Sequence, residues 1–261
     1  MEKILNQNEL DIELIKQLQE LAKENKFQEY LYLLNKNLEK LKIEECNEPL
    51  LYLPKHLSKD IFIKPFNQED DPEVENKKEY EKKLFLRKKV VDKINHAQDL
   101  LPKGYHLLIM DALRTEDMVW KLYKNYFQKK KKENPELSDK EIDLWLRNLL
   151  AMPDDPAPPG HMTGGAVDIA LVDNEGKEIP LEIDYEIVSK EEQKFTFCPR
   201  LPQEIIKKRK ILYDALTREG FHNYSREYWH YSYGDPYWAV RRKNKVAIYG
   251  IPRKDLFEKI S

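Results

Sequence analysis

The sequence predicts an α+β domain in which helices surround a few short strands. Apolar residues recur at helical spacing in several segments, whereas short apolar runs bounded by turn residues indicate strands. These segments do not alternate regularly, so a parallel sheet built from βαβ units is not expected. The chain has 261 residues, of which 41% are hydrophobic and 35% charged. This is enough to bury a sizeable core in one domain or at most two.

The first part of the chain is predicted to be largely helical. Residues 9–24 carry apolar side chains at helical spacing, and the same pattern returns over 80–101, where Pro102 and Gly104 end the helix. The segment between them, 46–76, is rich in Pro, Asp, Glu and Asn and is predicted to be irregular. Strands enter only after these helices.

The middle of the chain combines one strand with two helices. The apolar run at 105–110 lies between turn signals and predicts a buried strand. A helix is predicted over 116–130. Another begins at Ser138, which can form a capping box with Glu141, and it stops at the proline-rich segment 153–159.

The last third of the chain is predicted to hold three strands and one long helix. The run at 165–172 predicts a strand, and shorter strands are expected at 227–233 and 245–249. The helix over 202–219 begins with proline and is followed by Gly220, which is the usual asymmetry of helix ends. These strands complete the expected α+β arrangement.

Charge and composition argue against several classes of protein. The 45 basic and 47 acidic residues leave a net charge of -2, and the lysines at 129–132 suit a solvated helix end, so no nucleic-acid partner is expected. No apolar stretch approaches the ~18 residues of a membrane span, and the N-terminus lacks the apolar core of a signal peptide. Cys46 and Cys198 are too few for a disulfide framework. We therefore expect a cytoplasmic protein without a membrane partner.

Two histidines and an aspartate are the candidate metal ligands. His161 and Asp168 flank a run of small residues that lets a loop imidazole approach a carboxylate on the following strand, and His230 begins a later strand. Catalytic zinc takes three nitrogen or oxygen ligands from the protein and keeps a fourth position for water. Either histidine alone would more often be structural. Asp168 lies among strand residues, where a buried carboxylate seldom lacks a partner.

A carboxylate and an arginine accompany these ligands. Glu227, three residues before His230, could take a proton from a metal-activated water. Positions i and i+3 of a regular strand face opposite sides, so Glu227 must lie in the turn before the strand, or a bulge must intervene. Arg114 follows Asp111 past the end of the strand at 105–110. It could anchor a substrate carboxylate or stabilise the oxyanion of a tetrahedral intermediate.

Two motifs resemble the signatures of a known family. The segment from Pro159 to Asp168 resembles the SxHxxGxAxD signature of the D-Ala-D-Ala dipeptidases of the VanX type, and Glu227-Tyr-Trp-His230 resembles their ExWH signature. The motifs occur in order, about sixty residues apart, and the resemblance extends over about 100–240. It implies a hedgehog/DD-peptidase-like fold in which a small antiparallel sheet, flanked by helices, carries the zinc site.

The resemblance also implies a role for each residue. One zinc ion per chain would be held by the two histidines and the aspartate of the motifs, His161, Asp168 and His230. Glu227 would be the general base, and Arg114 would assist the transition state. We expect two neighbours, Asp111 and Trp229, to contact these residues and hold them in position.

The sequence departs from the family pattern around the expected substrate. Pro159 stands where the family has serine, and Glu182 replaces a glycine of the MGxxFD segment. The aspartate of that segment, which helps to hold the substrate ammonium, corresponds to Glu186 here, with Asp184 as the reserve candidate. These departures concern substrate choice rather than metal chemistry.

The resemblance divides the chain into a helical N-terminal extension, 1–76, and a zinc peptidase domain, 77–261. The expected activity is hydrolysis of a small dipeptide, foremost D-alanyl-D-alanine, by Glu-assisted attack of a zinc-bound water. One alternative is a DD- or LD-carboxypeptidase or endopeptidase that acts on peptidoglycan peptides. Another is a non-catalytic, zinc-stabilised binding module, although such a module needs no base at Glu227.

Overall fold

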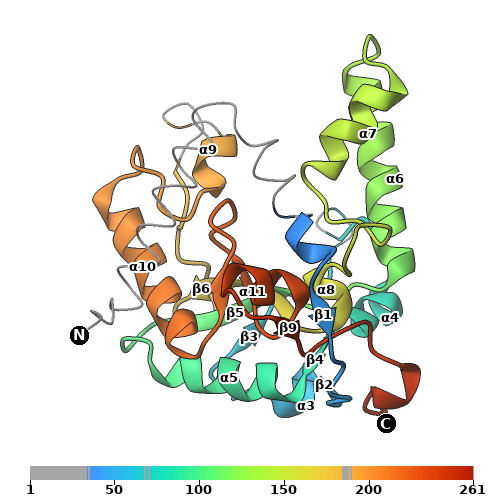
Figure 1. Ribbon diagram of the computed structural model, residues 1–261. Coiled ribbons are helices and arrows are strands. Elements are labelled where there is room, and N and C mark those ends of the chain that lie inside the picture. Colours follow the sequence, from blue (N-terminus) through green and yellow to red (C-terminus); the bar gives the residue numbers. More distant parts are fainter. Residues whose placement is uncertain are drawn as a thin grey trace, which may run out of the picture.

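The computed structural model (Figure 1) describes most of the chain from residue 34 onward. The described residues are 34, 36–67, 69, 71–183, 188 and 190–260. The helix predicted over 9–24 and the candidate residues Asp184 and Glu186 lie outside them. The division into an extension and a domain near residue 76 therefore stays a prediction.

The described part of the chain has an α+β fold built on a five-stranded sheet with the strand order β3-β5-β6-β8-β7. The strands are β3 (Phe62–Ile63), β5 (His106–Asp111), β6 (Ala166–Val172), β7 (His222–Asn223) and β8 (His230–Ser232). β5, β6, β8 and β7 pair antiparallel, but β3 pairs parallel with β5. The prediction of a small antiparallel sheet is wrong in this respect, since the sheet is mixed. A parallel pair requires a long crossover, and the chain between β3 and β5 supplies it with helices.

Two smaller sheets tie the segment before residue 60 to later parts of the chain. β1 (Lys42–Ile43) pairs parallel with β9 (Val246–Ala247). β2 (Leu50–Tyr52) pairs antiparallel with β4 (Phe85–Arg87). The segment 46–76 is thus not wholly irregular, because it contains β2 and β3 as well as a short helix. Its strands are two or three residues long, too short to show a period in the sequence.

Helices cover the sheet and extend from it (Figure 1). They are α3 (Leu53–His56), α4 (Lys77–Tyr80), η1 (Glu81–Lys83), α5 (Lys88–Asp99), α6 (Glu116–Glu133), α7 (Asp139–Arg147), α8 (Gly160–Thr163), α9 (Lys190–Lys194), α10 (Gln203–Arg218), α11 (Pro236–Arg241) and η2 (Lys254–Leu256). The buried faces of α5 and α10 belong to the same hydrophobic core as β5 and β6. None of the helices in the described ranges is long and apolar enough to cross a membrane.

Local sequence signals place several elements correctly. The strand predicted at 165–172 is observed as Ala166–Val172, and the helix predicted over 202–219 as Gln203–Arg218. α7 begins with the predicted capping box, in which Ser138 and Glu141 each bind the other's backbone amide. The helix predicted over 80–101 is wrong at its start. Phe85–Arg87 forms β4 instead, because these residues are buried and pair with β2.

Candidate metal centre

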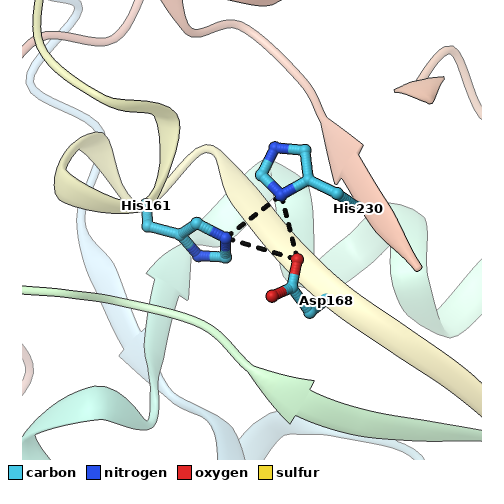
Figure 2. A group of neighbouring side chains, drawn as sticks. All are labelled: His161, Asp168 and His230. Carbon is cyan, nitrogen blue, oxygen red and sulfur yellow. Dashed lines mark hydrogen bonds and ion pairs between the residues drawn. The ribbon is translucent and has the colours of Figure 1, made fainter. Parts of the chain in front are cut away.

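Two strands and a short helix bring the candidate metal ligands together (Figure 2). His161 lies in α8, which leads through two glycines into β6. Asp168 lies in β6 directly opposite His230, the first residue of β8. Among the described residues, these three form a group able to hold a metal ion. His161 and Asp168 are 7% and 8% exposed, so their polar atoms are largely withdrawn from water.

The three potential donor atoms form a compact triangle. His161 Nε2 lies 3.3 Å from Asp168 Oδ1 and 3.2 Å from His230 Nδ1, and His230 Nδ1 lies 2.9 Å from Asp168 Oδ1 (Figure 2). Separations of this size allow all three atoms to contact one central ion. The sequence-predicted ligand set is therefore assembled in one place.

Hydrogen bonds orient both imidazoles. His161 Nδ1 lies 2.5 Å from the carbonyl oxygen of Ala112, which can only accept, so Nδ1 carries the proton and the lone pair of Nε2 points into the triangle. His230 Nε2 lies 3.4 Å from Ser232 Oγ, which leaves Nδ1 directed at Asp168. Two ring nitrogens then face each other and a carboxylate, an arrangement that a cation stabilises.

Charge within the triangle shifts the pKa values of its members. Burial opposes the charged form of His161, but the adjacent Asp168 carboxylate raises the pKa of His161 overall. Burial would likewise raise the pKa of Asp168, but His161 and His230 hold it well below its usual range. Asp168 therefore stays ionised, as a metal ligand must.

The small residues between His161 and Asp168 are needed for close packing. Gly164 has a φ of +70°, the left-handed conformation that ends α8. A Cβ atom on Gly165 would lie 2.6 Å from the carbonyl oxygen of Tyr233, and one on Gly160 would lie 2.7 Å from Asp235 Oδ2. The backbone of α8 thus packs against the segment that follows β8.

Glu227 lies in the turn between β7 and β8, the first of the two arrangements that its spacing from His230 allowed. Its backbone amide donates to Tyr224 O at 2.8 Å, and its carbonyl accepts from the amide of His230 at 3.1 Å. Burial raises the pKa of Glu227, the charge of His230 opposes that shift, and Asp168 adds to it. A carboxylate with a raised pKa beside the ligand triangle is a stronger proton acceptor than an ordinary one.

Arg114 is held beside the triangle by Asp111. Its Nε donates to Asp111 Oδ2 at 2.7 Å, and its Nη2 lies 3.8 Å from Asp168 Oδ2. Its backbone amide donates to the carbonyl of His161 at 3.2 Å. A register shift in the β5–β6 pairing brings Asp111 opposite Asp168. The Arg114 side chain is 22% exposed, so it can still contact a ligand.

Trp229 supports the site chiefly through its backbone. Its carbonyl accepts from the amide of Ile169, the neighbour of Asp168, at 2.9 Å. Its ring packs edge-on against Tyr228, with 4.8 Å between ring centroids. Tyr228 Oη in turn lies 3.3 Å from Glu182 Oε1. Glu182, which departs from the family pattern, is thus linked to the turn that carries Glu227.

A buried lysine behind Arg114 was not foreseen from the sequence. Lys83 is 2% exposed, and its ammonium contacts Glu73, Asp71 at 2.8 Å and Asp111 at 3.2 Å. Lys83 lies in a lysine pair and the two acids in an acidic loop, and both patterns are typical of a surface. No local signal distinguishes these residues, because their contacts form only in the folded chain.

The arrangement of His161, Asp168 and His230 suits a metal centre, and comparison with known proteins identifies the family. A family model described as D-ala-D-ala dipeptidase matches residues 73–246. A D-alanyl-D-alanine dipeptidase of Synechocystis sp. is 24% identical over 241 residues, covering 80% of this chain and 93% of the relative. The chain belongs to this family of D-Ala-D-Ala dipeptidases, so the predicted resemblance is confirmed.

Proposed function

We propose that the protein is a zinc-dependent dipeptidase that hydrolyses D-alanyl-D-alanine with one zinc ion per chain. The observation that carries the proposal is the triangle formed by His161, Asp168 and His230. Tetrahedral zinc with bonds near 2.1 Å places its ligands roughly 3.4 Å apart. The observed separations of 2.9 to 3.3 Å suit that geometry. Two imidazoles and a carboxylate are also the donor types of catalytic zinc.

The charge around the triangle supports a divalent ion. Among the described residues, ion pairs connect two cations, Lys83 and Arg114, with four carboxylates. These carboxylates belong to Asp71, Glu73, Asp111 and Asp168. A cation at the triangle would reduce this excess of negative charge, which is unfavourable when it is buried.

The residues around the triangle supply the other parts of a peptide hydrolysis. Bound zinc would polarise the scissile carbonyl and lower the pKa of a water molecule. Glu227 accepts the proton that the attacking water loses and delivers it to the leaving amine nitrogen. Arg114, oriented by Asp111, donates hydrogen bonds to the oxygen on which negative charge develops. Leaving this oxygen without a donor would raise the barrier to the reaction.

The proposal also concerns the substrate. Glu186, with Asp184 in reserve, is the proposed partner of the substrate ammonium, because it corresponds to the acidic residue of the family segment. A site that pairs a free ammonium and a free carboxylate should select dipeptides over longer or blocked peptides. A cytoplasmic location is part of the proposal, since free dipeptides rather than crosslinked wall would be available there.

A hydrolysis screen tests this function. Purified protein is supplied with D,D-, L,D- and L,L-dipeptides, with chelator and after zinc is restored, and released amine is measured. We expect D-alanyl-D-alanine to be the best substrate, chelator to abolish turnover and zinc to restore it. N-acetylation of an accepted dipeptide should reduce turnover at least about a hundredfold, because an unpaired buried charge costs roughly 3–5 kcal/mol.

The same screen separates the alternatives. Glu186→Gln should shrink the preference for a free amine while zinc content stays constant. Equal cleavage of acetylated and free dipeptides would contradict the dipeptidase and favour a carboxypeptidase. Zinc binding without hydrolysis of any peptide would instead indicate a non-catalytic module.

A further inference from the structure

The turn that carries Glu227 is held from inside by the side chain of Asn223. Asn223 ends β7 and is 6% exposed. Its amide nitrogen donates to the carbonyl oxygens of Glu227 and His230, each at 3.1 Å. One side chain therefore binds the backbone at both ends of the segment that separates the proposed base from the metal ligand.

The orientation of this amide is set by Thr196. Thr196 is 1% exposed, and its Oγ1 donates to Asn223 Oδ1 at 2.5 Å. Because the hydroxyl occupies the oxygen of the amide, the nitrogen must face the turn. The backbone amide of Thr196 also donates to Ser225 O at 2.9 Å, so the same residue touches the turn from outside.

These contacts join three separate parts of the chain. Tyr228 N donates to Lys194 O at 2.9 Å, which attaches the far side of the turn to α9. The carbonyl of His230 accepts from Tyr224 N at 3.0 Å in addition to Asn223. Glu227 thus owes its place to contacts that lie outside its own motif. A base displaced by about 1 Å can lose a hundredfold in rate.

We propose that Asn223, oriented by Thr196, is a positioning residue that sets the Glu227 carboxylate relative to the metal ligand His230. This inference rests on the proposed function, because it assigns Glu227 the role of base. The side-chain hydrogen bonds of Asn223 go to Thr196 and to the backbone of the turn. It acts through the backbone of the turn, so its removal alters the placement of Glu227 without removing a donor atom from the metal.

A double-mutant cycle tests the proposal in the full-length, zinc-loaded protein. Asn223→Ala and Thr196→Val should each lower kcat by about 10- to 100-fold, with KM and zinc content nearly unchanged. In a Glu227→Gln background, Asn223→Ala should lower the residual kcat by less than about twofold, because the group on which it acts is gone. Thr196→Ser keeps the hydroxyl, so its kcat should stay close to that of the parent protein, in contrast to Thr196→Val.

Asn95 offers a matched control. Its side chain also bridges backbone groups, accepting from Ser58 N at 2.8 Å and donating to His56 O at 2.9 Å, but it lies on α5. Asn95→Ala should lower thermal stability to a similar extent and leave kcat unchanged. This comparison separates an effect on the position of Glu227 from a general loss of fold stability.

Each outcome decides one question. An equal loss of kcat from Asn223→Ala with and without Glu227, or a loss of zinc, would overturn the positioning role. Should Asn223→Ala fail to fold, Thr196→Val decides by the same cycle, since valine keeps the shape and removes only the hydroxyl. Full activity of Glu227→Gln would contradict the proposed function itself. Full activity of the Asn223 variant beside an inactive Glu227→Gln would contradict only the positioning role.

Discussion

At the residue scale, the site depends on which atom each side chain presents. His161 presents Nε2 because the carbonyl of Ala112 takes the proton on Nδ1, whereas His230 presents Nδ1. The sequence predicts the residue types but not these choices. For His161 the choice follows from the backbone carbonyl of Ala112, 49 positions away, and for His230 from the side-chain hydroxyl of Ser232, which lies against Nε2. Because the metal ligands and the proposed base are different residues, zinc binding and proton transfer can be tested by separate substitutions.

Glu227→Gln should retain zinc and lose roughly 10²–10⁴-fold in kcat, because glutamine keeps the shape of the side chain but cannot accept a proton. His230→Ala should lose both zinc and activity. Zinc content by elemental analysis and turnover of the best dipeptide measure the two effects. His106→Ala is a control, since His106, the first residue of β5, contacts Asn174 and lies outside the triangle. Equal zinc loss in both site variants would instead make Glu227 a ligand.

At the element scale, packing between short elements sets the spacing of the ligands. α8 ends only three residues before β6 begins; β6 pairs with β8, and α8 packs against the segment that follows β8. The pattern of small residues indicates a tight turn here, but it cannot say what the turn approaches. The helix predicted over 80–101 was partly wrong for a related reason. The partner of β4, which is β2, is distant in sequence.

Gly165→Ala should weaken zinc binding and lower stability by about 1–3 kcal/mol, because the new Cβ would lie 2.6 Å from Tyr233 O. Denaturant unfolding and zinc titration measure the two effects. Gly104→Ala is the matched control. Gly104 has a φ of +86° and open space around its Cβ position, so it should lose stability from backbone strain alone and keep its zinc affinity. Unchanged zinc affinity in Gly165→Ala would refute this account of the spacing.

At the scale of the whole molecule, a buried ionic network connects the loop before α4 with the sheet and the metal ligands. Lys83 neutralises Asp71 and Glu73 and contacts Asp111, which in turn holds Arg114. Burial opposes the charged form of Lys83, but these carboxylates raise its pKa overall. The ammonium thus stays charged in the folded protein.

Lys83→Met should destabilise the fold by about 3–5 kcal/mol, because it leaves buried carboxylates without their cation. It should also reduce kcat, since Asp111 would no longer be held for Arg114. The midpoint of urea unfolding and the turnover rate measure these effects. Lys88→Met, which removes an exposed pair with Asp92, should hardly move the midpoint. A stable, fully active Lys83→Met variant would contradict the proposed link.

The sequence by itself predicted the α+β class, the helices α6, α7 and α10, the longest strand and the three residues that meet at the triangle. These features depend on local signals: periodicity, capping residues and motifs whose members are near in sequence. Tertiary structure alone decided the mixed sheet, the buried Lys83 network and the support of Glu227 by Asn223 and Thr196. The physical reason is that each of these depends on contacts between short or polar segments distant in sequence. A two-residue strand shows no period, and a buried ion pair has the same letters as a surface one.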